Sequence, residues 1–176
     1  LRRISERLIQ PESMVQETGR VVFFDSWGWD HRGLTQQYIR ALIALEIEFL
    51  FIFENESPAQ SSEIRLELEA YEKCEIFSLD QSLPLTDRLH SLYKQIQNYS
   101  PEKLLMHITP WAVEALVVFH ALSSVTKYQI NLTDHAFWLG TSCLDYSIEF
   151  RDYGCTVSLE KRNLRRNQLL LNPYYP

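Results

Sequence analysis

The sequence alternates short runs of β-branched, aliphatic and aromatic residues with longer segments whose apolar residues recur every three or four positions. The short runs, which predict strands, are 20–25, 47–53, 74–79, 103–108 and 127–132. Strands that alternate with helices are typical of βαβ units, in which the strands run parallel. Because such crossovers are right-handed, five units predict a Rossmann-like, doubly wound α/β domain whose mainly parallel sheet carries helices on both faces.

The segments between these runs predict helices, and the ends of the chain predict additional parts. The helices are expected from Leu34, from 58–62 to about Lys73, at 84–99 and at 111–122, the last with Pro110 at its first position. Beyond Gly140 the pattern is weaker, with candidate short strands at 146–150 and 169–171. We expect a helical extension at 1–19, the Rossmann-like domain at 20–171, and the start of a linker to a second domain at 172–176.

Composition narrows the class of function. The 176 residues, 45% of them hydrophobic, suffice for one globular core, and 17 basic against 23 acidic residues give a net charge of −6, which disfavours nucleic acid as a partner. The three cysteines form no C-x-x-C pair, and H-E-x-x-H and Asp-x-Asp motifs are missing, so we expect no metal site. The longest apolar stretch, 41–53, contains two glutamates. We therefore expect no membrane span. The few, scattered cysteines favour a reducing, cytoplasmic setting.

In open α/β sheets, ligands bind at the carboxyl ends of the strands. All four tryptophans follow predicted strands there, as do three of the five histidines: Trp27, Trp29, Trp111, Trp138, His31, His107 and His135. This distribution predicts a cleft that stacks flat, amphipathic ligands such as sugar rings. The alternative is that some of the indoles plug the top of the core. For His107 a structural role is favoured.

The loop after the first strand, 25–33, contains two isolated glycines before a helix. Gly28 and Gly33 would let a ligand approach the helix N-terminus, where Arg32 and Gly33 could meet an anionic group. Asp30 and His31 are expected to face the cleft, although Asp30 could instead cap the helix. The spacing is not that of a dinucleotide or phosphate-binding loop.

The segment after the fifth strand, 131–140, concentrates the candidate chemistry. His135 beside Asp134 could act as a general base, with Asp134 orienting it or capping a helix. The alternative for His135 is a buried, hydrogen-bonded histidine. Farther along, the basic cluster Lys161, Arg162, Arg165 and Arg166 is expected to be a solvated helix face or linker edge, or else a contact with a second domain or an anionic membrane surface.

The residues that carry a family resemblance are NLTDHAFWLG at 131–140, Asp145-Tyr146, 148–151 with Gly154, and 173–176. With these residues, the chain resembles the amino-terminal half of bacterial glycosyltransferases that have the two-domain GT-B architecture and are of the family 4 type. The resemblance implies an acceptor-binding domain opposite a second domain that binds the nucleotide-sugar donor, with no metal required. It also implies a histidine near the reacting centre, matched by His135, and a glycine-bearing loop near the donor diphosphate, matched by Gly28 and Gly33. Many members have adjacent glycines in that loop, whereas this chain has isolated ones.

Two hypotheses follow. In the first, the chain is the acceptor-side domain of a hexosyltransferase that moves a sugar from a nucleotide sugar to a hydroxyl of a glycan. The acceptor would contact Trp27, Trp29, Asp30, His31, Trp111, Phe137 and Trp138. The domain by itself would be inactive, its partner would be its own donor-binding domain, and peripheral contact with the inner face of the membrane is a further expectation. In the second, the chain is a non-enzymatic α/β binding or regulatory module, with Asp25 as a candidate phosphoacceptor.

Overall fold

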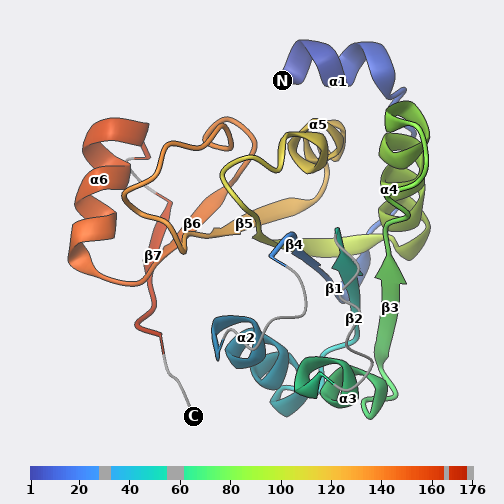
Figure 1. Cartoon of the computed structure of the whole chain (residues 1–176), viewed down its shortest axis with the longest axis horizontal. Helices are drawn as coiled ribbons and strands as arrows, with labels where there is room; N and C mark the ends of the chain where they lie inside the picture. Colours follow the sequence, from blue (N-terminus) through green and yellow to red (C-terminus); the bar gives the residue numbers. More distant parts are fainter. Residues whose placement is uncertain (28–32, 55–61, 165–166, 174–176) are drawn as a thin grey trace.

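The computed structural model describes residues 1–27, 33–54, 62–164 and 167–173, and shows one parallel sheet of seven strands in the order β3-β2-β1-β4-β5-β6-β7 (Figure 1). The strands are β1 (Glu17–Asp25), β2 (Phe49–Phe53), β3 (Cys74–Ser78), β4 (Pro101–His107), β5 (Thr126–Ile130), β6 (Tyr146–Glu149) and β7 (Gln168–Leu170). The helices are α1 (Arg2–Leu8), α2 (Gly33–Ala44), α3 (Glu63–Glu69), α4 (Leu85–Tyr99), α5 (Val113–Ala121) and α6 (Asp152–Arg162). The predicted fold class, α/β and Rossmann-like, is confirmed.

The central strands are apolar on both faces because both faces are covered. All five residues of β2 are buried, and its neighbour β1 is buried from Val21 onward. Side chains alternate between two cores: Val22 and Phe24 pack with α4 and α5, whereas Phe23 packs with α2 and α3. Helices on both faces are what the right-handed connections of a doubly wound sheet require.

The segment before β1 is part of this domain. β1 begins at Glu17, three residues before the predicted boundary, and α1 lies against α5 (Figure 1). Ile9, which follows α1, is only 1% exposed and belongs to the core beside α4 and α5. The segment 1–19 thus contains the helix α1 and the start of β1, and it packs against the core of the domain.

Three local predictions need correction. α5 begins at Val113, so Pro110 precedes the helix and is not its first residue. The predicted second helix is shorter than expected and begins after Ser62, whose hydroxyl accepts a hydrogen bond from the Arg65 backbone N–H. The segment after Gly140 contains both candidate strands, now β6 and β7, and between them α6, which the sequence pattern did not reveal.

β5 and β6 are connected differently from the other strands. Their connection, 131–145, contains turns and no helix, and it lies at the carboxyl edge of the sheet beside α6. It contains residues 131–140, in which the candidate chemistry of the sequence is concentrated. Among the helices that the structure describes, none is both long and apolar enough to cross a membrane.

Candidate functional site

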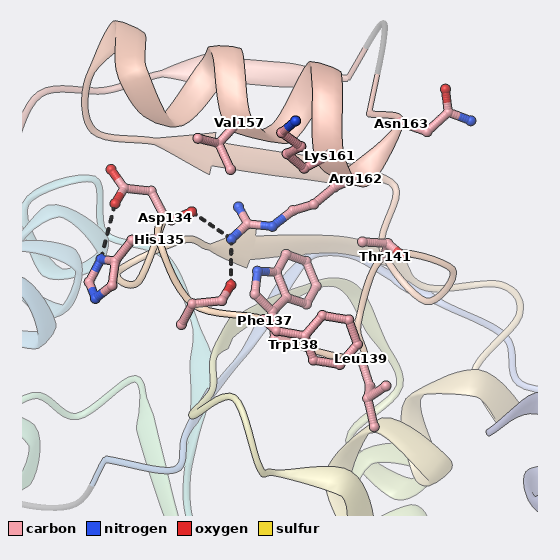
Figure 2. A pocket seen from close by; sticks show the side chains of 11 residues that line it. Asp134, His135, Phe137, Trp138, Leu139, Thr141, Val157, Lys161, Arg162 and Asn163 are labelled. Atoms are coloured by element: carbon pink, nitrogen blue, oxygen red, sulfur yellow. Dashed lines mark hydrogen bonds and ion pairs between the residues drawn. The ribbon is translucent and has the colours of Figure 1, made fainter.

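A cavity of about 460 Å³ lies between the β5–β6 connection and α6 (Figure 2). Its walls are formed by residues 134–139 and Thr141 on one side and by Val157, Lys161, Arg162 and Asn163 on the other. This volume falls within the range of about 300–1,000 Å³ that is usual for small-ligand pockets. The structure thus brings four sequence-predicted residues into one site: Asp134, His135, Phe137 and Trp138.

Arg162 joins the two walls. Its Nη2 donates to the backbone carbonyl oxygens of Asp134 and Ala136, both at 2.8 Å, and to that of Thr133 at 3.3 Å. Its guanidinium also lies 5.2 Å from the centre of the Trp138 ring, in cation–π geometry (Figure 2). The expectation of a solvated face is therefore wrong for Arg162, which is half-buried, whereas Lys161 is exposed. Arg165 and Arg166 lie outside the described residues.

Asp134 is bonded mainly to Arg151. Arg151 Nε and Nη2 donate to the two carboxylate oxygens at 2.6 and 2.9 Å, and this pairing holds the pKa of Asp134 below its usual value. The hydrogen bond from Ala136 N to Thr133 O closes a turn here, so Asp134 does not cap a helix as one alternative supposed.

His135 lies at the open side of the cavity. Its Nδ1 is 3.4 Å from the nearer Asp134 oxygen, a long contact, and its side chain is 74% exposed. The alternative of a buried, hydrogen-bonded histidine is thus wrong. The imidazole is accessible to a ligand, with a carboxylate on one side of it.

The carboxylate of Glu149 is buried and accepts hydrogen bonds from the segments around the cavity. Glu149 is completely buried and accepts hydrogen bonds from Asn131 Nδ2 at 2.7 Å, Ser147 Oγ at 2.5 Å and Ser158 Oγ at 2.6 Å. These donors come from the β5–β6 connection, β6 and α6. Gly154 permits the close approach, since a Cβ there would lie 2.8 Å from Glu149 Oε2. Glu149 therefore ties the β5–β6 connection and α6, which line the cavity, to β6.

The predicted aromatic residues divide into two groups. Trp138 is only 6% exposed, although this residue lines the cavity. For this indole the alternative interpretation, that it fills the top of the core, is confirmed. Phe137 and Trp111 are 83% and 71% exposed. Trp111 lies beside Trp27, with 6.2 Å between ring centres, at the ends of β1 and β4.

His107 has the structural role that was favoured. It is completely buried, as is Asp25, and Thr35 Oγ1 donates to Asp25 Oδ2 at 3.0 Å while lying 3.2 Å from His107 Nδ1. Asp25 also accepts the backbone N–H of Trp27 at 2.7 Å. A carboxylate enclosed in this way is inaccessible to a phosphoryl donor, so the phosphoacceptor alternative for Asp25 is wrong.

Much of the predicted donor-side loop is outside the described residues. This applies to Gly28, Trp29, Asp30, His31 and Arg32. Gly33 is the first residue of α2.

Glu54 is a titratable residue that the sequence reasoning missed. It directly follows the buried strand β2, at the same edge as Asp25. Burial, together with the negative charges of Glu114 and Asp25, raises its pKa to about 7 despite the opposing charge of Arg88. The sequence feature that could have indicated Glu54 is its position directly after a fully apolar strand.

The raised pKa predicts a pH-dependent stability. In the unfolded chain Glu54 ionises at its ordinary pKa of about 4.3, and in the folded chain near 7, so the folded state binds more protons between these values. Stability should fall as pH rises from about 4.5 to 7. Glu54→Gln should remove roughly 3 kcal/mol of this dependence in urea unfolding followed from pH 4.5 to 8. The exposed Glu160→Gln is the control, and an unchanged slope in Glu54→Gln would contradict the assignment.

Comparison with known proteins supports the fold. The sequence matches no known protein-family profile, and no curated protein sequence is significantly similar to it. Among solved structures, the chain resembles a mutant of the O-GlcNAc transferase of Thermobaculum terrenum, with a TM-score of 0.52 and 12% sequence identity. The match covers 85% of this chain and 28% of the transferase chain. The chain thus has the Rossmann-like fold found in part of a glycosyltransferase of the GT-B type, and this likeness does not extend to family 4 in particular.

Proposed function

We propose that this chain is the acceptor-binding domain of a glycosyltransferase that uses a nucleotide-sugar donor bound on a second domain. The observation that carries the proposal is the position of the 131–140 segment. It forms one wall of a ligand-sized cavity at the carboxyl edge of a GT-B-like sheet, with His135 exposed at the opening. The resemblance of this segment to family 4 glycosyltransferases supports the same role.

The geometry suits general-base assistance to an acceptor hydroxyl. The hydroxyl would donate its proton to an imidazole nitrogen of His135 as its oxygen attacks the anomeric carbon of the donor sugar, and the nucleoside diphosphate would leave on the other domain. Asp134 would then stabilise the positive charge that develops on His135. Asp134 is itself held by the bidentate bond from Arg151, so the carboxylate has a fixed position. The exposed ring of Phe137 offers a face on which the acceptor sugar can stack.

Replacing His135 by alanine in the complete protein should lower kcat for sugar transfer at least about tenfold, because general-base catalysis typically contributes 10²–10⁴-fold. The measurement is transfer to the acceptor under saturating donor. His90→Ala, which removes an exposed histidine from α4, is the matched control and should leave kcat unchanged. Equal turnover by wild type and His135→Ala would exclude the catalytic role.

A second candidate is a sugar-binding module without transferase activity, because a ligand-sized cavity suits binding as well as catalysis. Sugar binding without transfer by the complete protein, for any nucleotide sugar tested, would favour the module over the transferase.

A further inference from the structure

We infer that the cavity binds a sugar that carries a phosphate or carboxylate group, and that Lys161 and Arg162 bind this anionic group. The inference rests on the proposed sugar-binding function and specifies the class of acceptor. It depends on three features of the cavity: its balance of charge, its hydrogen-bond donors that have no acceptor, and its exposed aromatic ring.

The cavity wall is positively charged, although the chain as a whole carries a net charge of −6. Lys161 and Arg162 both line it, and within the described ranges neither forms an ion pair. Asp134 is the one acidic residue on the wall, and its carboxylate is bonded in bidentate fashion to Arg151. Two cations thus face the cavity with no carboxylate bound to either.

Arg162 is the less expected of the two, because it is partly removed from water. Burial lowers its pKa, and the negative charges of Glu149 and Asp134 only partly oppose this effect. Its hydrogen bonds go from Nη1 to Ser158 and from Nη2 to backbone carbonyls, all of them neutral acceptors. An anion placed against the guanidinium would compensate the charge that burial leaves unpaired.

The same wall contains hydrogen-bond donors that have no acceptor among the described residues. The Trp138 indole N–H is buried and has no hydrogen-bond partner in the part of the chain that the structure describes. The Nε–H of Arg162 and the ammonium of Lys161 likewise have no acceptor among these residues. The carbonyls of Thr133, Asp134 and Ala136 already accept from Arg162. Such a wall matches a ligand rich in acceptor oxygens, as phosphates and carboxylates are.

The remaining wall suits a sugar ring. Phe137 is 83% exposed and Leu139 is 44% exposed, so an apolar surface borders the charged wall (Figure 2). A sugar has an apolar face of C–H groups that can pack on an aromatic ring. The cavity therefore combines a surface for the ring with cations for a charged substituent.

Helix electrostatics alone also favour basic residues in the last turn of α6, so the experiment has to separate ligand binding from helix stability. Glucose 1-phosphate, glucuronate and methyl glucoside would be titrated into the chain by calorimetry. Lys161→Gln should weaken binding of the two anionic sugars roughly tenfold, the loss of about one charge-assisted hydrogen bond. Lys161→Arg should retain it. Arg3→Gln, which removes a positive charge from the exposed surface of α1, is the control and should bind as wild type does.

Free phosphate and anionic lipid could supply the same anionic group, so each is tested separately in the binding experiment. Inorganic phosphate that binds as tightly as glucose 1-phosphate, or vesicles of phosphatidylglycerol that bind the chain while the anionic sugars do not, would overturn the inference that the ligand is a sugar. Equal affinity for methyl glucoside and the anionic sugars would overturn the role of Lys161 and Arg162, but would leave the proposed acceptor function standing. Binding of none of the sugars would overturn the inference, whereas the transferase proposal is judged separately by the His135→Ala assay.

Discussion

Replacing Glu149 by alanine is expected to lower the free energy of unfolding by about 4 kcal/mol, since three buried donors lose their shared acceptor at once. Those donors, from Asn131, Ser147 and Ser158, stay enclosed between β6, α6 and the β5–β6 connection and would have no water to bond. Urea unfolding followed by circular dichroism measures the change. A loss of this size is a large fraction of the total stability of a single domain.

Two variants make the Glu149 result specific. Glu149→Gln keeps the shape of the side chain and one strong acceptor, so it should cost less, roughly 1–2 kcal/mol. Glu160→Ala removes an exposed glutamate from α6 and should change stability by less than about 0.5 kcal/mol. If Glu149→Ala costs no more than Glu160→Ala, the buried network does not hold the cavity walls together.

Gly140→Ala is expected to cost on the order of 3 kcal/mol and to deform the cavity, because a new methyl group would overlap a buried ring. A Cβ at this position would lie 2.5 Å from Cε3 of Trp138 and closer still to Cζ3. The ring has little freedom to move, since it is 6% exposed and lies beneath the Arg162 guanidinium. Unfolding by urea gives the energy, and near-ultraviolet circular dichroism reports the environment of Trp138.

Gly19→Ala is the matched control for this substitution. A Cβ at Gly19 would meet no atom within 4 Å, but its φ of +87° disfavours alanine. The expected cost is therefore only about 1 kcal/mol, from backbone conformation alone. Comparable losses for the two variants, or an unchanged near-ultraviolet spectrum in Gly140→Ala, would contradict the packing argument.

The fold was largely predictable because the sequence patterns that indicate its strands and helices extend over only a few residues each. β2 lies between β3 and β1 and is an unbroken apolar run, and α2 beside it shows the three-and-four spacing that a buried face requires. Strand ends differed by one to three residues, where hydrogen bonding to neighbouring strands extends or shortens a strand. β1, for example, reaches back to Glu17 because it pairs with Pro101 on β4.

α6 shows why one helix escaped prediction. Its buried residues are Gly154 and Ser158, a small one and a polar one, so no apolar periodicity marks its inner face. Small and polar residues are suitable there because the surface that they cover is the carboxylate of Glu149. A helix packed on a polar group cannot be recognised by a search for hydrophobic spacing.

The candidate site was predictable from one side only. The position of 131–140 after a strand placed His135, Asp134, Phe137 and Trp138 at the ligand-binding edge, and the structure brings these four into one cavity. The opposite wall comes from about 25 residues farther along the chain. Arg162 was expected on a solvated face, and only its contacts with backbone carbonyls reveal that it closes the cavity.

From β1 to β5, the order of strands and helices, and with it the edge of the sheet at which a ligand would bind, was predictable from the sequence alone, because periodicity and chirality act over short distances. Tertiary structure alone decided the partners of the buried polar groups: Arg151 for Asp134, Ser158 for Glu149, and Thr35 for Asp25. These pairs join segments that lie 9 to 17 residues apart in the sequence. A buried polar group must find a hydrogen-bond partner, but which one it finds depends on how the elements pack, and local sequence patterns do not encode that choice.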